Sequence, residues 1–361
     1  MSIEINKRIP SLDGLRAISI FLVVFGHAFR RYFKLVDLAN LGVRFFFIIS
    51  AYLIVGILFR DIKRNSFSIK TFYFKRVLRT FPAFYVYLLI LFIFLNTKGI
   101  FHLEQFWRAP IYLENYHPRS LWNQNQWFVG HTWSLAVEEQ FYILISLIFL
   151  LLNRKMIKFK HMLYIFIGIV FIVPLIRISY LYFKEIPNVF RGSIHRSFET
   201  VADSLAIGGI LALLPIQLFL ESKYFTFFKN KIWILLILIL IIQMTNSSIM
   251  VSYFGLIPRY VYNLLGLGII HISFGIIMLV TISFPKETFF SNFLNNKIVV
   301  TIGLWSYSIY LWQQVWLYSW DFSIVVKFIG ILICSSLSYY LVEVKFLNFR
   351  DKALRTRNIN N

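Results

Sequence analysis

The stretch from residue 40 to residue 59, NLGVRFFFIISAYLIVGILF, is 20 residues long and carries a single charge. About 20 mostly apolar residues in a helix are needed to cross the hydrocarbon core of a bilayer. The stretch therefore predicts a transmembrane helix, and nine other segments meet the same requirement. The ten predicted spans lie near residues 12–33, 40–59, 80–96, 134–152, 162–182, 201–220, 232–250, 260–283, 300–320 and 324–344.

The composition of the whole chain agrees with these spans. Of its 361 residues, 58% are hydrophobic and 15% are charged, whereas soluble domains carry about 25% charged residues. The one cysteine, Cys334, excludes an internal disulfide and a cysteine-based zinc site. We predict an all-α, polytopic membrane protein that forms one transmembrane domain over residues 1–361, with no appended soluble domain and no metal.

The net charge of +21 indicates topology and not nucleic-acid binding. Binding to nucleic acid would require the cations to gather on one water-facing surface. Instead, Lys and Arg form short clusters between apolar segments, and most of them fall in the N-terminus and in alternate loops. By the positive-inside rule, both termini are predicted to lie in the cytoplasm.

Two ionisable residues in the first span require an explanation, because a charge within a span costs about 2.5–3.5 kcal/mol on insertion scales. Arg16 and His27 are eleven residues apart, which places them on one helix face and roughly 16 Å apart. Arg16 would lie near the cytoplasmic entrance and His27 beyond the midplane. A buried neutral imidazole bonded to a neighbouring helix explains His27 equally well.

Two adjacent carboxylates, Glu138 and Glu139, stand near the start of the span 134–152. An N-terminal cap with Ser134 would explain one acidic residue better than two. This span is predicted to run inward from outside, so Glu138 should lie near the depth of His27. A carboxylate there could fix the imidazole tautomer and stabilise its charged form.

Arg76 and Arg79 are three residues apart and share a helix face at the cytoplasmic edge of the third span. Guanidinium groups bind phosphate bidentately, so the pair suits an anionic, phosphate-bearing molecule. Ordinary anchoring to lipid headgroups is the other explanation, since the loop 60–79 holds seven cations and one acidic residue.

The connection over residues 97–133 is rich in aromatic side chains. It contains Trp107, Trp122, Trp127, Trp133, His102, His117 and His131. An interfacial aromatic belt is the favoured interpretation, and a stacking floor for a sugar ring is the alternative.

Five motifs in register resemble the acyltransferase-3 family, the membrane O-acyltransferases of bacterial surface glycans. The motifs are Arg16 with His27 after ten intervening residues, FFFIISAYLI at 45–54, RVLR at 76–79, TWSLAVEEQFY at 132–142 and SYSIYLW at 306–312. The chain departs from the family pattern at Gln313, where His is usual, at Ala51, at Arg44 and after Glu343. Gln313 cannot act as an acid or a base, and these departures bear on the acceptor and on activity.

The resemblance implies a multi-pass protein of the bacterial inner membrane. Its expected reaction is transfer of an acyl group, acetyl by family frequency, from cytoplasmic acyl-CoA to a hydroxyl of a surface or exported glycan such as a polysaccharide or lipopolysaccharide. Acyl-CoA would be a co-substrate, with no permanently bound cofactor, and the other partners would be a glycan or glycolipid acceptor and membrane lipid. The implied catalytic residues are His27, Glu138 and Arg16. The implied donor-binding residues are Arg76, Arg79 and Arg16. The expected acceptor-binding residues are Trp133, Glu139 and Tyr310.

Two other classes of protein are also compatible with these sequence features. Intramembrane charges also mark the path of a transporter or flippase for a glycolipid or a small solute. A non-catalytic relative that acts in envelope assembly is the third class, to which Gln313 lends weight.

Overall fold

The structure is a computed structural model that describes residues 9–30, 32–33, 35–118, 127–183, 194–215, 219, 221–283, 289–319 and 321–359. Its described residues form helices and no strand, as the sequence predicts. The long helices are α1 (Pro10–Ala28), α2 (Leu38–Lys63), α3 (Ile69–Thr97), α5 (Trp133–Asn153), α6 (Phe159–Tyr182), α8 (Phe198–Leu213), α11 (Ile232–Thr245), α14 (Leu267–Ser283), α16 (Lys297–Ser319), α17 (Ile324–Ser338) and α18 (Val344–Ile359).

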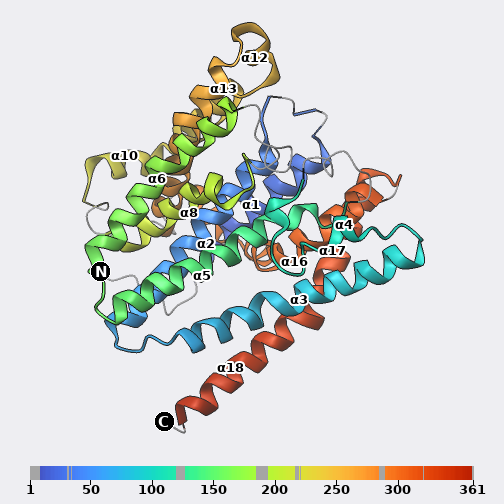
Figure 1. Cartoon of the computed structure of the whole chain (residues 1–361), viewed down its shortest axis with the longest axis horizontal. Coiled ribbons are helices and arrows are strands. Elements are labelled where there is room, and N and C mark those ends of the chain that lie inside the picture. The colour runs from blue at the N-terminus through green and yellow to red at the C-terminus, as the bar shows by residue number, and fades with distance from the viewer. Residues whose placement is uncertain are drawn as a thin grey trace.

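Shorter elements connect the long helices. They are α4 (Leu103–Phe106), α10 (Lys223–Asn230), α12 (Ser248–Phe254), α13 (Ile257–Val261), α15 (Phe289–Leu294), the 3-10 turns η1 (Glu114–Tyr116) and η3 (Gly130–Thr132), and the π-helical turns η4 (Tyr262–Gly266) and η5 (Tyr339–Glu343). The η5 turn joins α17 to α18, and α18 extends away from the helix bundle along α3 (Figure 1).

Seven helical stretches of the described chain are long and apolar enough to cross a membrane. They are Pro10–Ala28, Leu38–Lys63, Ile69–Thr97, Gly130–Asn153, Phe159–Tyr182, Ile257–Ser283 and Ile324–Thr356. The pair α11 and α12, bent by 56°, makes an eighth if it counts as one span. Each of the ten predicted spans overlaps a helix, but the number ten stays a prediction.

The remaining two predicted spans correspond to α8 and α16. The α8 helix is only 16 residues long. The α16 helix has 23 residues but carries polar side chains, and Ser306, Ser308 and Gln313 among them are buried. Its polar face is turned toward protein, so low hydropathy is compatible with a position inside the bundle.

Helix α1 lies at the centre of the fold, in contact with α2 on one side and α16 on the other. Two glycines permit this close packing. A Cβ atom on Gly303 of α16 would lie 1.8 Å from the carbonyl oxygen of Asp13, and one on Gly42 of α2 would lie 2.5 Å from that of Ser19. Small residues let membrane helices approach closely, so α1 is fixed against both neighbours, and the face of α1 that bears Arg16 is fixed with it.

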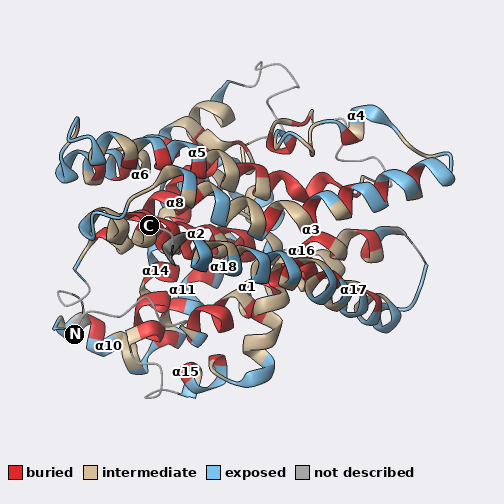
Figure 2. Cartoon of the chain, turned by 90° about the horizontal axis from the view of Figure 1, so that it is seen from below, coloured by how far each residue is buried: buried red, intermediate tan, exposed pale blue. Residues whose placement is uncertain are grey.

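A buried polar cluster joins four helices in the part of the bundle beyond α2. Asp203 of α8 forms ion pairs with Arg177 of α6 at 2.8 Å and with Arg44 of α2 at 3.7 Å. Its carboxylate also lies 3.4 Å from Nδ1 of His271 on α14. Each of these four side chains is at most 2% exposed. Two guanidinium groups therefore share one carboxylate inside the fold. Figure 2 shows buried residues concentrated in inner helices such as α2, α8 and α14, whereas α6 is largely exposed and residues 344–356 of α18 are exposed or half-buried.

Candidate active site

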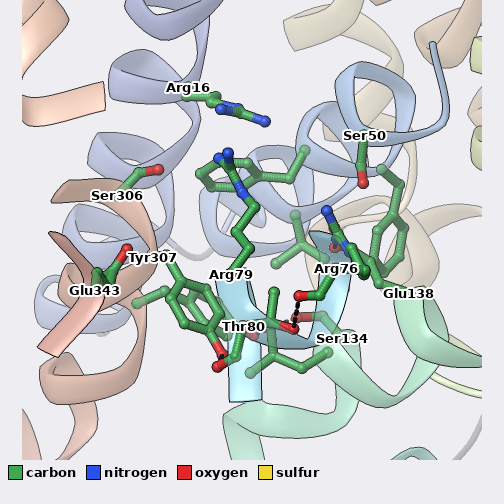
Figure 3. Close-up of a pocket in the computed structure, with 15 residues that line it drawn as sticks. Arg16, Ser50, Arg76, Arg79, Thr80, Ser134, Glu138, Ser306, Tyr307 and Glu343 are labelled. Carbon is green, nitrogen blue, oxygen red and sulfur yellow. Dashed lines mark hydrogen bonds and ion pairs between the residues drawn. The ribbon is translucent and has the colours of Figure 1, made fainter. Parts of the chain in front are cut away.

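A cavity opens between α1, α2, α3, α5, α16 and η5, and five charged side chains line it (Figure 3). The cavity holds about 740 Å³ of space that no protein atom fills, part of it open to the outside. Its charged lining residues are Arg16, Arg76, Arg79, Glu138 and Glu343. Its polar lining residues include Ser50, Thr80, Ser134, Ser306, Tyr307 and Tyr310. Residues of all five sequence motifs thus meet at one place.

The guanidinium groups of Arg16 and Arg79 face each other across this cavity (Figure 3). Arg16 lies 3.6 Å from Asp13, one turn earlier on α1. No carboxylate of the described chain lies within ion-pair distance of Arg79, whose side chain is exposed to the cavity. Two guanidinium groups therefore line one cavity, and guanidinium groups are suited to binding anions such as phosphate.

Arg76 has a different environment, although it lies one turn from Arg79. Its Nη2 donates to Glu138 Oε2 at 3.3 Å and to the Tyr142 hydroxyl, and its guanidinium lies 3.8 Å from the centre of the Tyr142 ring. The Tyr142 hydroxyl also donates to Glu138 at 2.6 Å and is 2.7 Å from Ser50 Oγ. Arg76 is therefore held in an ion pair, and only Arg79 of the predicted pair is open to a ligand.

His27 is at the far end of α1 from Arg16 and does not line the cavity. Its Nδ1 lies 3.2 Å from Oε1 of Gln313 on α16. The expected contact between His27 and Glu138 is therefore wrong, since each has a different partner. Glu138 lies on the face of α5 turned toward Arg76 of α3, whereas His27 is turned toward α16.

Tyr310 connects the cavity to the surroundings of His27. It lines the cavity, accepts a hydrogen bond from Ser134 Oγ at 2.7 Å and donates to the carbonyl oxygen of His131. Three residues further along α16 comes Gln313, the partner of His27, and residues three apart share a helix face. One face of α16 therefore runs from the cavity wall to the imidazole.

The other two predicted acceptor residues are not among the lining residues of the cavity. Glu139 accepts a hydrogen bond from Thr80 Oγ1 at 3.4 Å. Trp133 is buried and packs edge-on against Phe47. The centre of its ring lies 5.9 Å from the guanidinium carbon of Arg196. Only Tyr310 of this predicted set reaches the cavity.

Glu343 was not predicted as a site residue, although it lines the cavity. It lies in the π-helical turn η5 and accepts a hydrogen bond from Ser308 Oγ of α16. π-helical turns occur often at functional sites. A lone carboxylate in an otherwise apolar segment was the signal that could have identified it.

The described residues between α3 and α5 form a packed segment, the cap, and the interfacial aromatic belt stays a prediction. Trp127 Nε1 donates to Glu114 Oε1 at 3.1 Å, and the Trp127 ring stacks edge-on with His117 at 4.3 Å. Burial raises the pKa of the Glu114 carboxyl from 4.5 to about 8 and, together with the charge of Arg196, lowers the pKa of His117 from 6.5 to about 3. Trp122 lies outside the described residues.

The raised pKa of Glu114 predicts that the cap loses stability in alkaline solution. Because the pKa of Glu114 is raised by folding, its contribution is complete below pH 4.5 and is lost as the pH rises through about 8. We expect the melting temperature of the wild-type protein to fall between pH 6 and pH 9, and that of the Glu114→Gln variant to fall less. The exposed Glu104→Gln change, in the same connection, is the matched control. Parallel melting curves for wild type and Glu114→Gln would refute the prediction.

The described chain contains no group of three or more His, Cys, Asp or Glu residues arranged to hold a metal ion. The cavity presents the guanidinium groups of Arg16 and Arg79. The imidazole of His27 lies further along α1, in contact with α16. Fold and site together define a polytopic membrane protein with a charged cavity between its helices.

Comparison with known proteins identifies the family. The acyltransferase domain of the acyltransferase-3 family matches residues 9–342, and the chain belongs to this family. No solved structure matches the chain.

Three similar proteins are longer than this chain. Peptidoglycan O-acetyltransferase OatA of Listeria monocytogenes serovar 1/2a is 29% identical over 331 residues, which cover 85% of this chain and 49% of the relative. O-acetyltransferase OatA of Staphylococcus aureus NCTC 8325 is 27% identical over 85% of this chain and 50% of the relative. A candidate O-acetyltransferase of S. aureus strain COL is 27% identical over 97% and 59%. The chain thus spans about half to three fifths of their lengths.

Proposed function

We propose that this chain is an O-acyltransferase of the bacterial inner membrane, which moves an acyl group from cytoplasmic acyl-CoA to a hydroxyl of a surface glycan. Acetyl is the proposed acyl group, because the similar proteins are named O-acetyltransferases. The observation that carries the proposal is the pair Arg16 and Arg79, which face each other across a cavity whose α16 wall leads to His27.

In this proposal the donor's phosphates bind between Arg16 and Arg79. Phosphate oxygens accept charge-assisted hydrogen bonds from guanidinium groups. Both arginines lie on the side of the bundle that the distribution of cations predicts to be cytoplasmic. Glu138 and Tyr142 hold Arg76 in the cavity wall and compensate its charge, which leaves Arg16 and Arg79 to contact the donor in this proposal.

The proposed reaction uses His27 as a general base. The unprotonated ring nitrogen takes the proton of the acceptor hydroxyl as the hydroxyl oxygen bonds to the acyl carbon. The carbon–sulfur bond of the thioester then breaks, and the proton passes from the imidazolium to the departing CoA thiolate. The ring returns to its neutral form, and the products are an ester and free CoA.

The proposal is tested with the full chain in lipid nanodiscs, in which both faces are open to added substrates. Acetyl-CoA and solubilised peptidoglycan glycan strands are the probes, and the expected product is a base-labile acetyl ester on the strands. In cells, deletion of the gene should remove an acyl mass from surface glycans. Loss of a whole glycan would indicate a transporter instead, and unchanged glycans would indicate a non-catalytic relative.

Arg79→Gln should raise the KM for acetyl-CoA about 10–100-fold with a smaller effect on kcat, because a charge-assisted hydrogen bond is worth about 1.5–3 kcal/mol. Lys75→Gln, an exposed cation on the same helix, is the control and should leave the KM unchanged. An unchanged KM in Arg79→Gln would assign Arg79 to lipid anchoring.

A further inference from the structure

Gln313 is the hydrogen-bond partner of the proposed base, although the family pattern has His at its position. Its side chain is completely buried, and Oε1 lies 3.2 Å from His27 Nδ1. The two residues are 286 positions apart in the sequence. Their contact is therefore made by the packing of α1 against α16 and by no local turn.

The identity of the contacting atoms determines the tautomer of the imidazole. A carboxamide oxygen is only an acceptor, so the ring nitrogen that faces it must carry the proton. With the proton on Nδ1, the lone pair of the neutral ring is on Nε2. The hydrogen bond a histidine makes through one nitrogen sets the state of the other, so Nε2 is the nitrogen able to accept a proton from a substrate.

The second polar group of the same side chain has no partner. Gln313 Nε2 is buried and makes no hydrogen bond to any residue that the structure describes. An unpaired buried donor destabilises a folded protein, and such groups call for an explanation. Because Nε2 and Oε1 share one carboxamide, this unused donor lies beside the imidazole.

We infer that Gln313 is the positioning residue of His27: its oxygen holds Nδ1–H and leaves Nε2 as the base, and its free amide N–H group is the donor available to a substrate oxygen beside the ring. The inference rests on the proposed function. It also explains how this chain tolerates the departure from His at this position. A glutamine cannot transfer protons, but it can accept the hydrogen bond that orients the ring.

Gln314 offers a matched control, because it makes the same kind of contact with another histidine. Its Oε1 lies 3.1 Å from His131 Nδ1, on the same helix and one residue further along. Removal of that hydrogen bond alters α16 one residue away and leaves the partner of His27 in place. Gln314→Met should therefore leave the shape of the kcat–pH profile unchanged.

The test compares Gln313→Met and Gln313→Glu with wild type and Gln314→Met in nanodiscs, with acetyl-CoA and peptidoglycan strands as probes. Gln313→Met should lower kcat about 10–100-fold with little change in the KM for acetyl-CoA, as losses of orienting partners typically do. Gln313→Glu keeps the acceptor oxygen but favours the charged ring. Its acidic limb in the kcat–pH profile should move to higher pH by about one unit or more.

The outcomes separate this inference from the proposed function. If wild type transfers acetyl and His27→Gln does not, the function stands. The positioning role of Gln313 would then be refuted by a wild-type kcat in Gln313→Met. It would equally be refuted if the acidic limb of the kcat–pH profile did not move in Gln313→Glu. If the wild-type protein transfers no acetyl group, the proposed function itself is refuted. Should Gln313→Met not fold, as judged by thermal unfolding, the pH profile of Gln313→Glu decides.

Discussion

The His27→Gln variant is expected to lose acyl transfer, with kcat reduced about 10²–10⁴-fold, the usual contribution of a general base. Glutamine is close to histidine in size and can still form a hydrogen bond with Gln313, so the packing of α1 against α16 should survive. It cannot accept a proton at neutral pH. The measurement is the steady-state rate of ester formation in nanodiscs with acetyl-CoA and peptidoglycan strands.

Two further measurements keep this prediction open to refutation. Thermal unfolding of His27→Gln should match that of wild type, which excludes a folding defect as the cause. The exposed residue His102 provides the control substitution, and His102→Gln should retain activity. If His27→Gln transferred acetyl at the wild-type rate, the proposed base would be excluded and the reaction would need another proton acceptor.

Features that depend on one helix alone were predictable from the sequence. The spacing of Arg16 and His27 fixed their common helix and their separation, because helix geometry is local. Charged residues of three motifs, Arg16, Arg79 and Glu138, line one cavity, in agreement with the rule that a charge within a span requires a partner or a cavity. The all-helical fold followed from the lengths of the apolar segments in the same way.

Pairings between helices were not predictable, because they depend on how each helix is rotated and shifted against its neighbours. Glu138 was expected beside His27 on the basis of depth in the membrane. The rotation of α5 instead directs it to Arg76, at 3.3 Å. His27 faces Gln313, a residue that the sequence motif presents only as a loss of acid–base chemistry.

Arg76 and Arg79 illustrate the same limit within one motif. Both lie on α3 and line the cavity, and the sequence assigns them the same task. The structure separates them, because Glu138 and Tyr142 engage Arg76 and leave Arg79 facing Arg16 (Figure 3). A spacing of three residues establishes that two side chains are neighbours, but it does not establish which of them another helix will neutralise.

Asp203→Asn is expected to destabilise the protein by about 3–5 kcal/mol, the cost of leaving a buried charge without its partner. Asp203 is the carboxylate shared by Arg44 and Arg177 within the fold, and asparagine has nearly the same shape without the charge. Four helices meet at this side chain, so the loss should be global. The measurement is the melting temperature in detergent, together with the yield of folded protein.

A surface ion pair provides the matched control. Asp351 lies 2.7 Å from Arg350 on α18 but is half exposed, so Asp351→Asn should cost at most about 1 kcal/mol. If Asp203→Asn does not accumulate, Arg177→Met in the same chain should restore part of the yield, because it removes one of the uncompensated cations. Equal melting temperatures for Asp203→Asn and wild type would show that the two buried guanidinium groups do not depend on this carboxylate for their compensation.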